Sequence, residues 1–450
     1  MYVNRVIRLF LLCTGVLFSS HLLAVPQIET WRTANGAKVL YVHAPELPMV
    51  DVRVVFDAGS ARDGDKPGVT SFTSSLLAEG AGEWSAFQIA ERLEGVGAQL
   101  NVGSLRDMAW VSVRSLTEPQ ALDITLETLA AVLAKPSFAE EDMERERQSI
   151  LAGLLQDEQS PGSLGKKQLY KLVFGDHPYA ADPDGTMESV KSITRKDIQE
   201  THRRLYVARN ALVAIVGAVD RDHAGKIAEQ VTRDLSAGEP VPSLPVVNPI
   251  EKAVVKQIPF PSTQSHLYLG QPGLKRGDAD YFELYVGNHI LGGSGLVSML
   301  SGEVREKRGL SYSVYSYFLP MRQLGIFQLG LQTKNEQADE ALKVVKSTLA
   351  RYIEKGPTEE ELQAAKQNIT GGFPLRIASN GKIVEYLAVI GFYDLPLDYL
   401  DTFVDKVRAV TREDIQDAFK RRVDPERLVR VQVGRLEPPL AQVGENRAGD

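Results

Sequence analysis

Apolar and polar residues alternate along several stretches of this 450-residue chain. From Val50 to Phe56 every second residue is apolar, as in a strand with one buried face. In the stretches that begin at Ala121 and Ala341, apolar residues instead recur at helical spacing, and a proline with acidic residues opens a further helix. Each half runs in the order strands, helix, strands, helices and a closing strand. This order predicts an α+β fold of two homologous domains, each a mostly antiparallel sheet with helices packed on one face.

Two pairs of segments repeat in register between the halves. Residues 193–217 and 410–434 share one pattern at an offset of 217 positions. Each copy begins with a Thr and an Asp three residues apart, a capping-box-like helix start, and leads into a β-branched strand that stops at glycine. The stretches from Ala121 and Ala341 keep an offset of about 220. We therefore expect a duplicated domain.

Four prolines between positions 240 and 249 remove backbone donors and favour extended structure, so they predict a linker near the middle of the chain. The expected organisation is a signal peptide (1–24), an N-terminal peptidase-like domain (26–236), a Pro-rich linker (237–250), a C-terminal peptidase-like domain (251–436) and a flexible tail (437–450).

The N-terminal segment has the layout of a secretory signal. Arg5 and Arg8 precede an apolar run over residues 9–18, and Ala24 stands before a polar stretch. We expect the mature chain to begin near Val25. An uncleaved membrane anchor is the alternative.

The composition indicates in which compartment the protein acts and which classes of partner it can bind. Cys13 is the only cysteine and lies in the signal, so the mature chain has neither disulfides nor thiolate chemistry. This favours a bacterial periplasm, although Cys13 as a lipoprotein cysteine stays open. A net charge of −7 without a dense Lys/Arg cluster argues against a nucleic-acid partner. No segment after the signal is expected to insert into a membrane.

A helix is predicted to begin at Gly68, in the sequence GVTSFTSS. This stretch resembles the pitrilysin/insulinase family of zinc peptidases, which includes the mitochondrial processing peptidases. In that family the matching strand is followed by Gly-x-x-His-x-x-Glu-His, where two His bind zinc and the Glu activates water. The three chemical positions are here Ser71, Ser74 and Ser75. Their hydroxyls neither bind Zn²⁺ well nor act as a base near neutral pH.

No other metal site can be assembled from the sequence. The resemblance places the third zinc ligand, a Glu, near Ala152 or Gly153, and neither residue coordinates metal. None of the seven histidines stands at ligand spacing with another on one helix. For His177, in the sequence FGDHPYAADPDGT, a structural loop role is favoured over metal binding. Ser71 lacks an assignable base and is not interpreted as a nucleophile.

The second half retains the family's other signature, in the sequence GGSGLVSMLSGEVREKRGLSY. In active relatives this pattern places an Arg and a Tyr over the bound peptide opposite the zinc, and the matching residues are Arg305 and Tyr312. A guanidinium holds a peptide carbonyl or carboxylate, and a phenol stabilises a tetrahedral oxyanion. The alternative is that Arg305 forms a surface ion pair with Glu303 or Glu306 and that Tyr312 is a core aromatic.

Three glycines open this signature: Gly292, Gly293 and Gly295. By resemblance to two-subunit processing peptidases, they are expected to form a mobile lip for substrate access. Plain turn formation is the alternative.

The resemblance implies a function that depends on a partner. In the family a complete chamber needs four such domains, and bacterial members of this size often build it from two chains. We expect this chain to be the non-catalytic subunit of a heterodimeric zinc metallopeptidase that cleaves unfolded peptides. It would have no cofactor of its own, and a zinc-bearing homologous subunit would carry the Zn²⁺. The alternatives are an inactive peptide-binding or scaffold protein of the same fold, and a metal-independent hydrolase.

Overall fold

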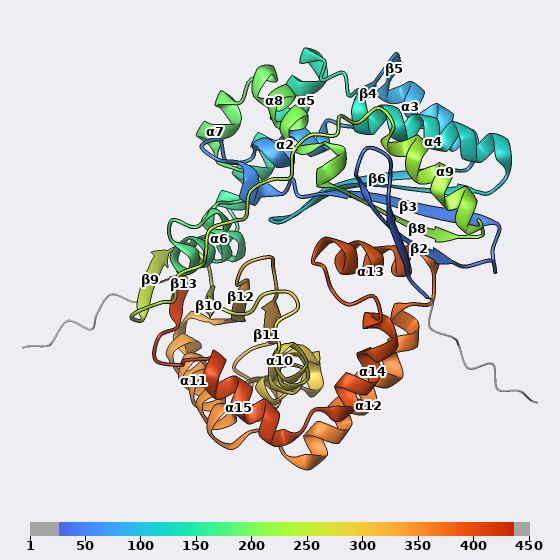
Figure 1. The fold of residues 1–450 in the computed structure, drawn as a ribbon. Coiled ribbons are helices and arrows are strands. Elements are labelled where there is room, and N and C mark those ends of the chain that lie inside the picture. The colour runs from blue at the N-terminus through green and yellow to red at the C-terminus, as the bar shows by residue number, and fades with distance from the viewer. Residues whose placement is uncertain (1–26, 436–450) are drawn as a thin grey trace, which may run out of the picture.

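The computed structural model describes residues 27–435. They form two halves that face each other, with a five- or six-stranded sheet in each (Figure 1). The N-terminal sheet has the order β1 (Glu29–Arg32), β2 (Lys38–His43), β8 (Ala211–Gly217), β3 (Met49–Phe56), β7 (Ala109–Leu116) and β6 (Gln99–Ser104). The C-terminal sheet has the order β9 (Val254–Pro259), β13 (Val429–Gly434), β10 (Gln264–Pro272), β12 (Ile326–Lys334) and β11 (Ser313–Leu319).

The two sheets share one topology. β2 pairs parallel with β8 and β9 pairs parallel with β13, whereas every other neighbour in the two sheets is antiparallel. Apart from β1, each strand of the first sheet has a counterpart at the same place in the second. This confirms the predicted pair of homologous α+β domains. The predicted domain limits stay predictions, and the signal peptide and the tail lie outside the described residues.

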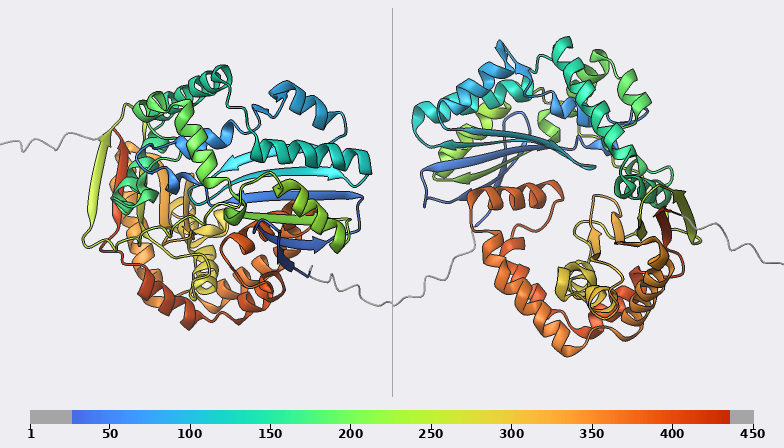
Figure 2. Two further views of the ribbon diagram at one scale, coloured as in Figure 1. Left: turned by 45° about the horizontal axis from the view of Figure 1, so that its top comes forward. Right: turned by 180° about the vertical axis from the view of Figure 1, so that it is seen from behind.

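Helices cover the outward face of each sheet (Figures 1 and 2). The helices of the N-terminal half are α2 (Val69–Ser75), α3 (Ala86–Glu94), α4 (Pro119–Ala134), α5 (Glu140–Glu158), α6 (Pro161–Phe174), α7 (Met187–Ser192), α8 (Arg195–Leu205) and α9 (Arg221–Thr232). Those of the C-terminal half are α10 (Tyr281–Asn288), α11 (Ala338–Lys355), α12 (Glu359–Arg376), α13 (Asn380–Phe392), α14 (Tyr399–Ala409) and α15 (Arg412–Arg422). A short hairpin of β4 (Gly80–Ala81) and β5 (Trp84–Ser85) precedes α3.

The capping boxes predicted for the repeated segments are present. The side chain of Thr194 accepts from the backbone of Asp197 at the start of α8, and Thr411 accepts from Asp414 at the start of α15. Each cap satisfies backbone donors that the first helical turn leaves free. Equivalent local signals therefore begin equivalent helices in the two halves.

Two helices are exchanged between the halves. α6 packs against β10 and β13 of the C-terminal sheet, and α13 packs against β3 and β8 of the N-terminal sheet. Glycine allows both approaches: a Cβ on Gly165 of α6 would lie 2.4 Å from the ring of Tyr268, and one on Gly391 of α13 would lie 2.6 Å from Leu212. The second face of each sheet is thus covered by a helix of the other half.

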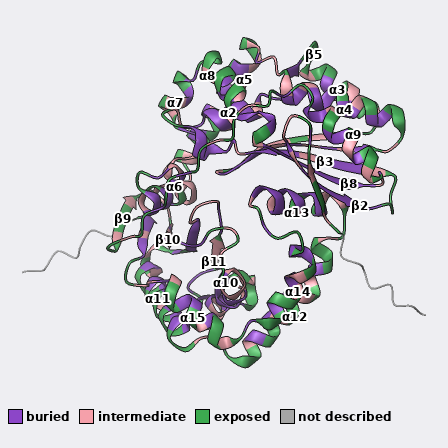
Figure 3. Cartoon of the chain, in the orientation of Figure 1, coloured by how far each residue is buried: buried purple, intermediate pink, exposed green. Residues whose placement is uncertain are grey.

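This exchange changes the expectation for β3. The alternating pattern predicted a strand with one buried face, yet Asp51 is buried, because α13 covers the face on which it lies. Asp51 pairs with Arg114 at 3.1 Å, and Arg53 reaches Glu385 of α13 at 3.6 Å. The covered polar residues are thus paired with opposite charges. Buried residues are concentrated where helices meet the sheets and where the halves meet (Figure 3).

No helix within residues 27–435 is long and apolar enough to cross a membrane.

Candidate functional site

Helix α2 carries the three serines that the resemblance matches to the zinc motif, and hydrogen bonds hold its start. Gly68 precedes it with φ of 92°, a left-handed conformation that favours glycine. The Asp63 carboxylate accepts hydrogen bonds from the Gly68 and Thr70 amides at 2.7 and 2.9 Å, and from the Thr70 hydroxyl at 2.7 Å. Burial raises the pKa of Asp63 to about 6, although these three hydrogen bonds act to lower it. The helix geometry thus rests on a carboxylate that the sequence did not reveal.

The three serines of α2 bond to nearby acceptors. Ser74 is buried and lies 3.3 Å from the Gly103 carbonyl of β6, and Ser75 donates to the Phe72 carbonyl at 3.0 Å. Ser71 faces the Asp184 carboxylate at 3.4 Å, a weak contact. Within the described residues no histidine or lysine hydrogen-bonds these hydroxyls. These hydroxyls offer neither good metal ligands nor an activated nucleophile.

The helix expected to carry the third ligand, α5, also lacks one at that place. Ala152 and Gly153 are both exposed on it. α5 instead approaches α2 through Arg147, whose guanidinium lies 5.4 Å from the ring centre of Phe72 and donates to the Ile193 carbonyl at 2.9 Å. In the described part of the chain, no three His, Cys, Asp or Glu side chains are grouped so that they could hold a metal ion.

His177 has the structural role favoured from its loop sequence. One ring nitrogen, Nδ1, accepts from the Tyr179 amide at 3.1 Å, so the other nitrogen, Nε2, carries the proton and donates to the Pro245 carbonyl at 3.0 Å. Burial lowers the pKa of this histidine. The ring therefore ties the loop after α6 to the Pro-rich segment.

Tyr312 projects from the C-terminal half instead of joining a core. Its side chain is 88% exposed, so the alternative of a core aromatic is wrong. Arg305 lies in a π-helical turn (Ser301–Glu306), and its nearest carboxylate is that of Glu306 at 3.5 Å. An exposed pair at this distance contributes little to stability. Both side chains are thus free of strong interactions within the described chain.

The turn that carries Arg305 is anchored by its neighbour Glu303. This carboxylate pairs with Lys307 at 3.0 Å, with Arg308 at 2.7 Å and with Arg351 of α11 at 2.9 Å. Hydrogen bonds from Lys307 and then Arg308 lower the pKa of Glu303 to about 2. π-helical turns are often found at functional sites, and the ion pairs of Glu303 hold this one in place. Sequence spacing alone gave no sign of Glu303 as an anchor.

The three glycines have different environments. Gly292 and Gly293 lie in a second π-helical turn, His289–Gly293. A Cβ on Gly292 would lie 2.3 Å from the Ser316 hydroxyl of β11, and one on Gly293 would lie 2.9 Å from Asn288, so close packing requires both glycines. Gly295 has φ of 64° and open space around it, and the exposed Leu296 and Val297 follow it. A mobile lip stays a prediction, best placed at Gly295 to Val297.

Comparison with known proteins agrees with this arrangement. Residues 38–182 match the family pattern described as insulinase (peptidase family M16), and residues 192–369 match the peptidase M16 inactive domain. The crystal structure of a peptidase M16 inactive domain from Pseudomonas fluorescens is 40% identical, with a TM-score of 0.88, and covers 91% of this chain and 98% of that one. The chain belongs to the M16 family, the pitrilysin/insulinase peptidases.

More distant relatives include the non-peptidase homolog YmxG of Helicobacter pylori, 28% identical over 87% of this chain and 90% of that protein. An uncharacterized zinc protease of Streptomyces coelicolor is 27% identical over 78% and 77%. A protease structure from Helicobacter pylori, 19% identical with a TM-score of 0.84, shares the fold over 91% of this chain and all of that one. By its similarity to the M16 inactive domain and its solved structure, this chain is a peptidase-like M16 protein of the inactive type.

Proposed function

We propose that this chain is the non-catalytic subunit of a heterodimeric zinc metallopeptidase. It would supply Arg305 and Tyr312 to a site whose Zn²⁺ is held by a homologous subunit, and the pair would cleave unfolded peptides. The observation that carries the proposal is the exposure of Tyr312, 88%, in a chain whose own α2 has lost the metal ligands. A phenol without a role in its own core is available to a second molecule.

The chemistry of the two side chains suits this task. The Arg305 guanidinium, held by one weak ion pair at 3.5 Å, can exchange Glu306 for a peptide carbonyl or carboxylate. The Tyr312 hydroxyl can donate to an oxyanion that develops when a zinc-activated water attacks the peptide bond. Neither role needs a metal in this chain.

The strand next to Tyr312 offers a place for the peptide. β11 begins at Ser313 and lies at the edge of its sheet, paired only with β12 among the described strands. An edge strand presents unpaired N–H and C=O groups on which an extended peptide can form a further strand. A peptide bound there would run beside Tyr312.

A second candidate function is a peptide-binding or scaffold protein without cleavage. The Helicobacter pylori relative is named a non-peptidase homolog, and the degenerate α2 agrees with such a role. Retention of an Arg and a Tyr suited to stabilising a transition state favours the subunit role instead.

The deciding experiment is reconstitution. The purified chain and a zinc-bearing M16 protein from the same source are assayed separately and mixed, each with and without chelator, on a fluorogenic unfolded peptide. Activity that appears only in the mixture and disappears with chelator supports the proposal. A stable complex with peptide binding but without cleavage supports the scaffold function, and chelator-insensitive cleavage by this chain alone would mean a metal-independent hydrolase.

We further propose that the mature protein acts in the periplasm. The support is the charged and apolar pattern of residues 1–24 and the absence of cysteine after Cys13. N-terminal sequencing of the protein from a periplasmic fraction tests this, and a start near Val25 is the expected result.

A further inference from the structure

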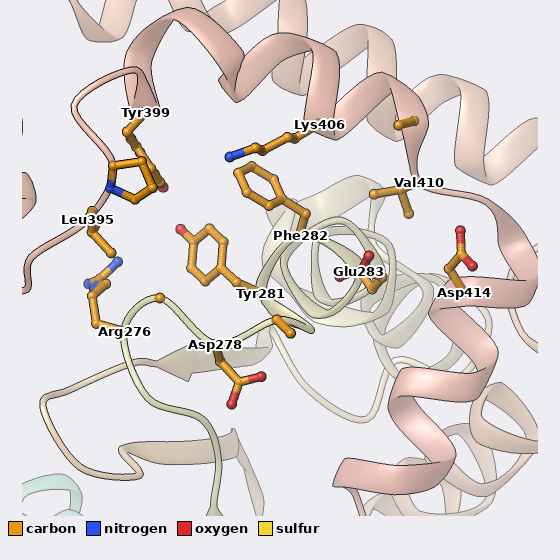
Figure 4. A pocket seen from close by; sticks show the side chains of 14 residues that line it. Arg276, Asp278, Tyr281, Phe282, Glu283, Leu395, Tyr399, Lys406, Val410 and Asp414 are labelled. Carbon is orange, nitrogen blue, oxygen red and sulfur yellow. The ribbon is translucent and has the colours of Figure 1, made fainter.

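Three adjoining cavities hollow the C-terminal half, with volumes of about 480, 530 and 320 Å³. Arg276, in the loop before α10, and Tyr281, at the start of α10, line all three. In the cavity of Figure 4, Tyr281 and Phe282 of α10 face Tyr399 and Lys406 of α14. The three cavities thus adjoin one another around Arg276 and Tyr281.

The 530 Å³ cavity has an unbalanced positive charge. Arg276, Arg376 and His289 line it, and no Asp or Glu does. The Nε of Arg276 is buried and has no hydrogen-bond partner within the described chain. A buried donor without a partner costs about 1–3 kcal/mol, and more when it is charged. A ligand that accepts a hydrogen bond from this guanidinium would remove that cost.

Arg376, at the end of α12, also lacks a carboxylate partner among residues 27–435. Its polar neighbours are the phenol groups of Tyr285 and Tyr386. Burial lowers the pKa of Arg376, but the two phenol oxygens raise it by more, so that the pKa is raised overall. Arg376 in turn adds to burial in lowering the pKa of His289. The guanidinium thus stays charged, while the histidine beside it is kept neutral.

The acids of the adjoining cavities are mostly engaged elsewhere. Asp278 pairs with Arg422 at 2.7 Å and Asp414 caps α15, whereas the exposed Glu385 makes only a 3.6 Å contact with Arg53. Glu283 lines the 480 Å³ cavity and not the 530 Å³ cavity, and burial raises its pKa. Within residues 27–435 none of these carboxylates forms an ion pair with Arg276 or Arg376.

We propose that the 530 Å³ cavity binds a carboxylate group of a peptide, through Arg276 and Arg376. This deepens the proposed function and rests on it. The cavity is bordered by the glycine segment, Gly292 to Gly295, and by Tyr315 and Tyr317 of β11, whose rings stack at 5.9 Å. A peptide paired with β11 would therefore have the cavity beside it. Two guanidiniums and phenol hydroxyls are suited to a carboxylate, and the aromatic walls to the attached carbon chain.

The carboxylate can be the C-terminus or an acidic side chain, and three probes separate these sources. Each is an N-terminally fluorescein-labelled peptide of 15 residues built from Ala, Ser, Thr and Gly. One has a free C-terminus, one has a C-terminal amide, and one has the amide together with two internal Glu residues. Binding to the full mature chain is measured by fluorescence polarisation, for the wild type, Arg276→Gln, Arg376→Gln and Arg408→Gln. Arg408 is the matched control, since its side chain is 66% exposed and lines none of the three cavities.

We expect at least one carboxylate probe to bind the wild type about 10-fold more tightly than the plain amide, as loss of a charged hydrogen bond predicts. Arg276→Gln and Arg376→Gln should abolish that preference and Arg408→Gln should not. A preference for the free C-terminus or for the internal Glu identifies the source. Equal binding of all three probes, or a preference that survives both arginine variants, overturns the inference while leaving peptide binding intact. Failure of the wild type to bind any probe would count against the proposed function as well.

Discussion

The hydroxyl of Tyr393, at the end of α13, donates a hydrogen bond of 2.9 Å to the carboxylate of Asp107, which lies between β6 and β7. Tyr179 donates to the same carboxylate at 2.5 Å, and so does the Arg322 amide at 2.7 Å. Asp107 is buried and the three donors come from both halves of the chain. One carboxylate thus joins the end of α13, the loop after α6 and the β11–β12 connection.

Replacing Asp107 should weaken the contact between the halves. Asp107→Ala leaves buried phenol and amide donors without an acceptor, so we expect a loss of about 3 kcal/mol in the free energy of unfolding. Urea denaturation measures it. Asp405→Asn, on an exposed carboxyl of α14, should change stability by less than about 0.5 kcal/mol. Equal effects of the two changes would contradict the role given to Asp107.

Glu303 should make stability depend on pH in the acid range. Its pKa is about 2 in the folded chain against an ordinary 4.5, so its contribution is complete above pH 4.5 and is lost as the pH falls toward 2. Because its basic partners are partly exposed, we expect about 1–2 kcal/mol. Glu303→Gln should lower stability at pH 7 and flatten its dependence between pH 5 and 2. Glu354→Gln, an exposed change on α11, should do neither.

The exchange of helices can be tested at a glycine. In Gly165→Ala the new methyl group would lie 2.4 Å from the ring of Tyr268, and overpacking of this kind costs about 1–3 kcal/mol. Gly153→Ala, on the exposed side of α5 with open space around it, should instead stabilise the chain by about 0.5–1 kcal/mol. Thermal denaturation of both variants checks the sign of each effect. A neutral Gly165→Ala would show that α6 does not press against β10 in solution.

Whether the chain binds zinc should depend on the side chains at positions 71 and 75 of α2. Zinc should leave the Tm of the wild type unchanged, because its hydroxyls are poor ligands. In Ser71→His with Ser75→His, two imidazoles stand one helical turn apart, and zinc should raise the Tm by a few degrees in a manner that chelator reverses. Calorimetry with and without zinc makes the comparison. Stabilisation of the wild type by zinc would point to a metal site away from the serine positions of α2.

The sequence predicted the features that rest on local pattern. The repeats at an offset of 217 indicated two homologous domains, and the resemblance to the pitrilysin/insulinase motifs singled out Ser71 and Tyr312. It did not reveal the exchange of α6 and α13, because an apolar helix face does not say which sheet it covers. The alternation around Asp51 accordingly predicted more exposure than this residue has.

Contacts between distant residues were equally hidden. Asp107 and Tyr393 are 286 positions apart, and neither lies in a recognisable motif. The sequence offers Glu303 as a possible partner of Arg305, yet Glu303 pairs with three other basic residues. The cavity around Arg276 arises from a loop and several helices that only the folded chain brings together.

Arg305 and Tyr312 are proposed to act on a site held by another subunit, and turnover of the reconstituted pair tests this role. kcat is measured with the wild type and with Arg305→Ala combined with Tyr312→Phe, while gel filtration confirms that the complex still forms. Removal of transition-state interactions should lower kcat by about 100-fold or more without releasing the partner, whereas Arg427→Ala should have no effect. Unchanged turnover by the double variant in an intact complex would contradict the account.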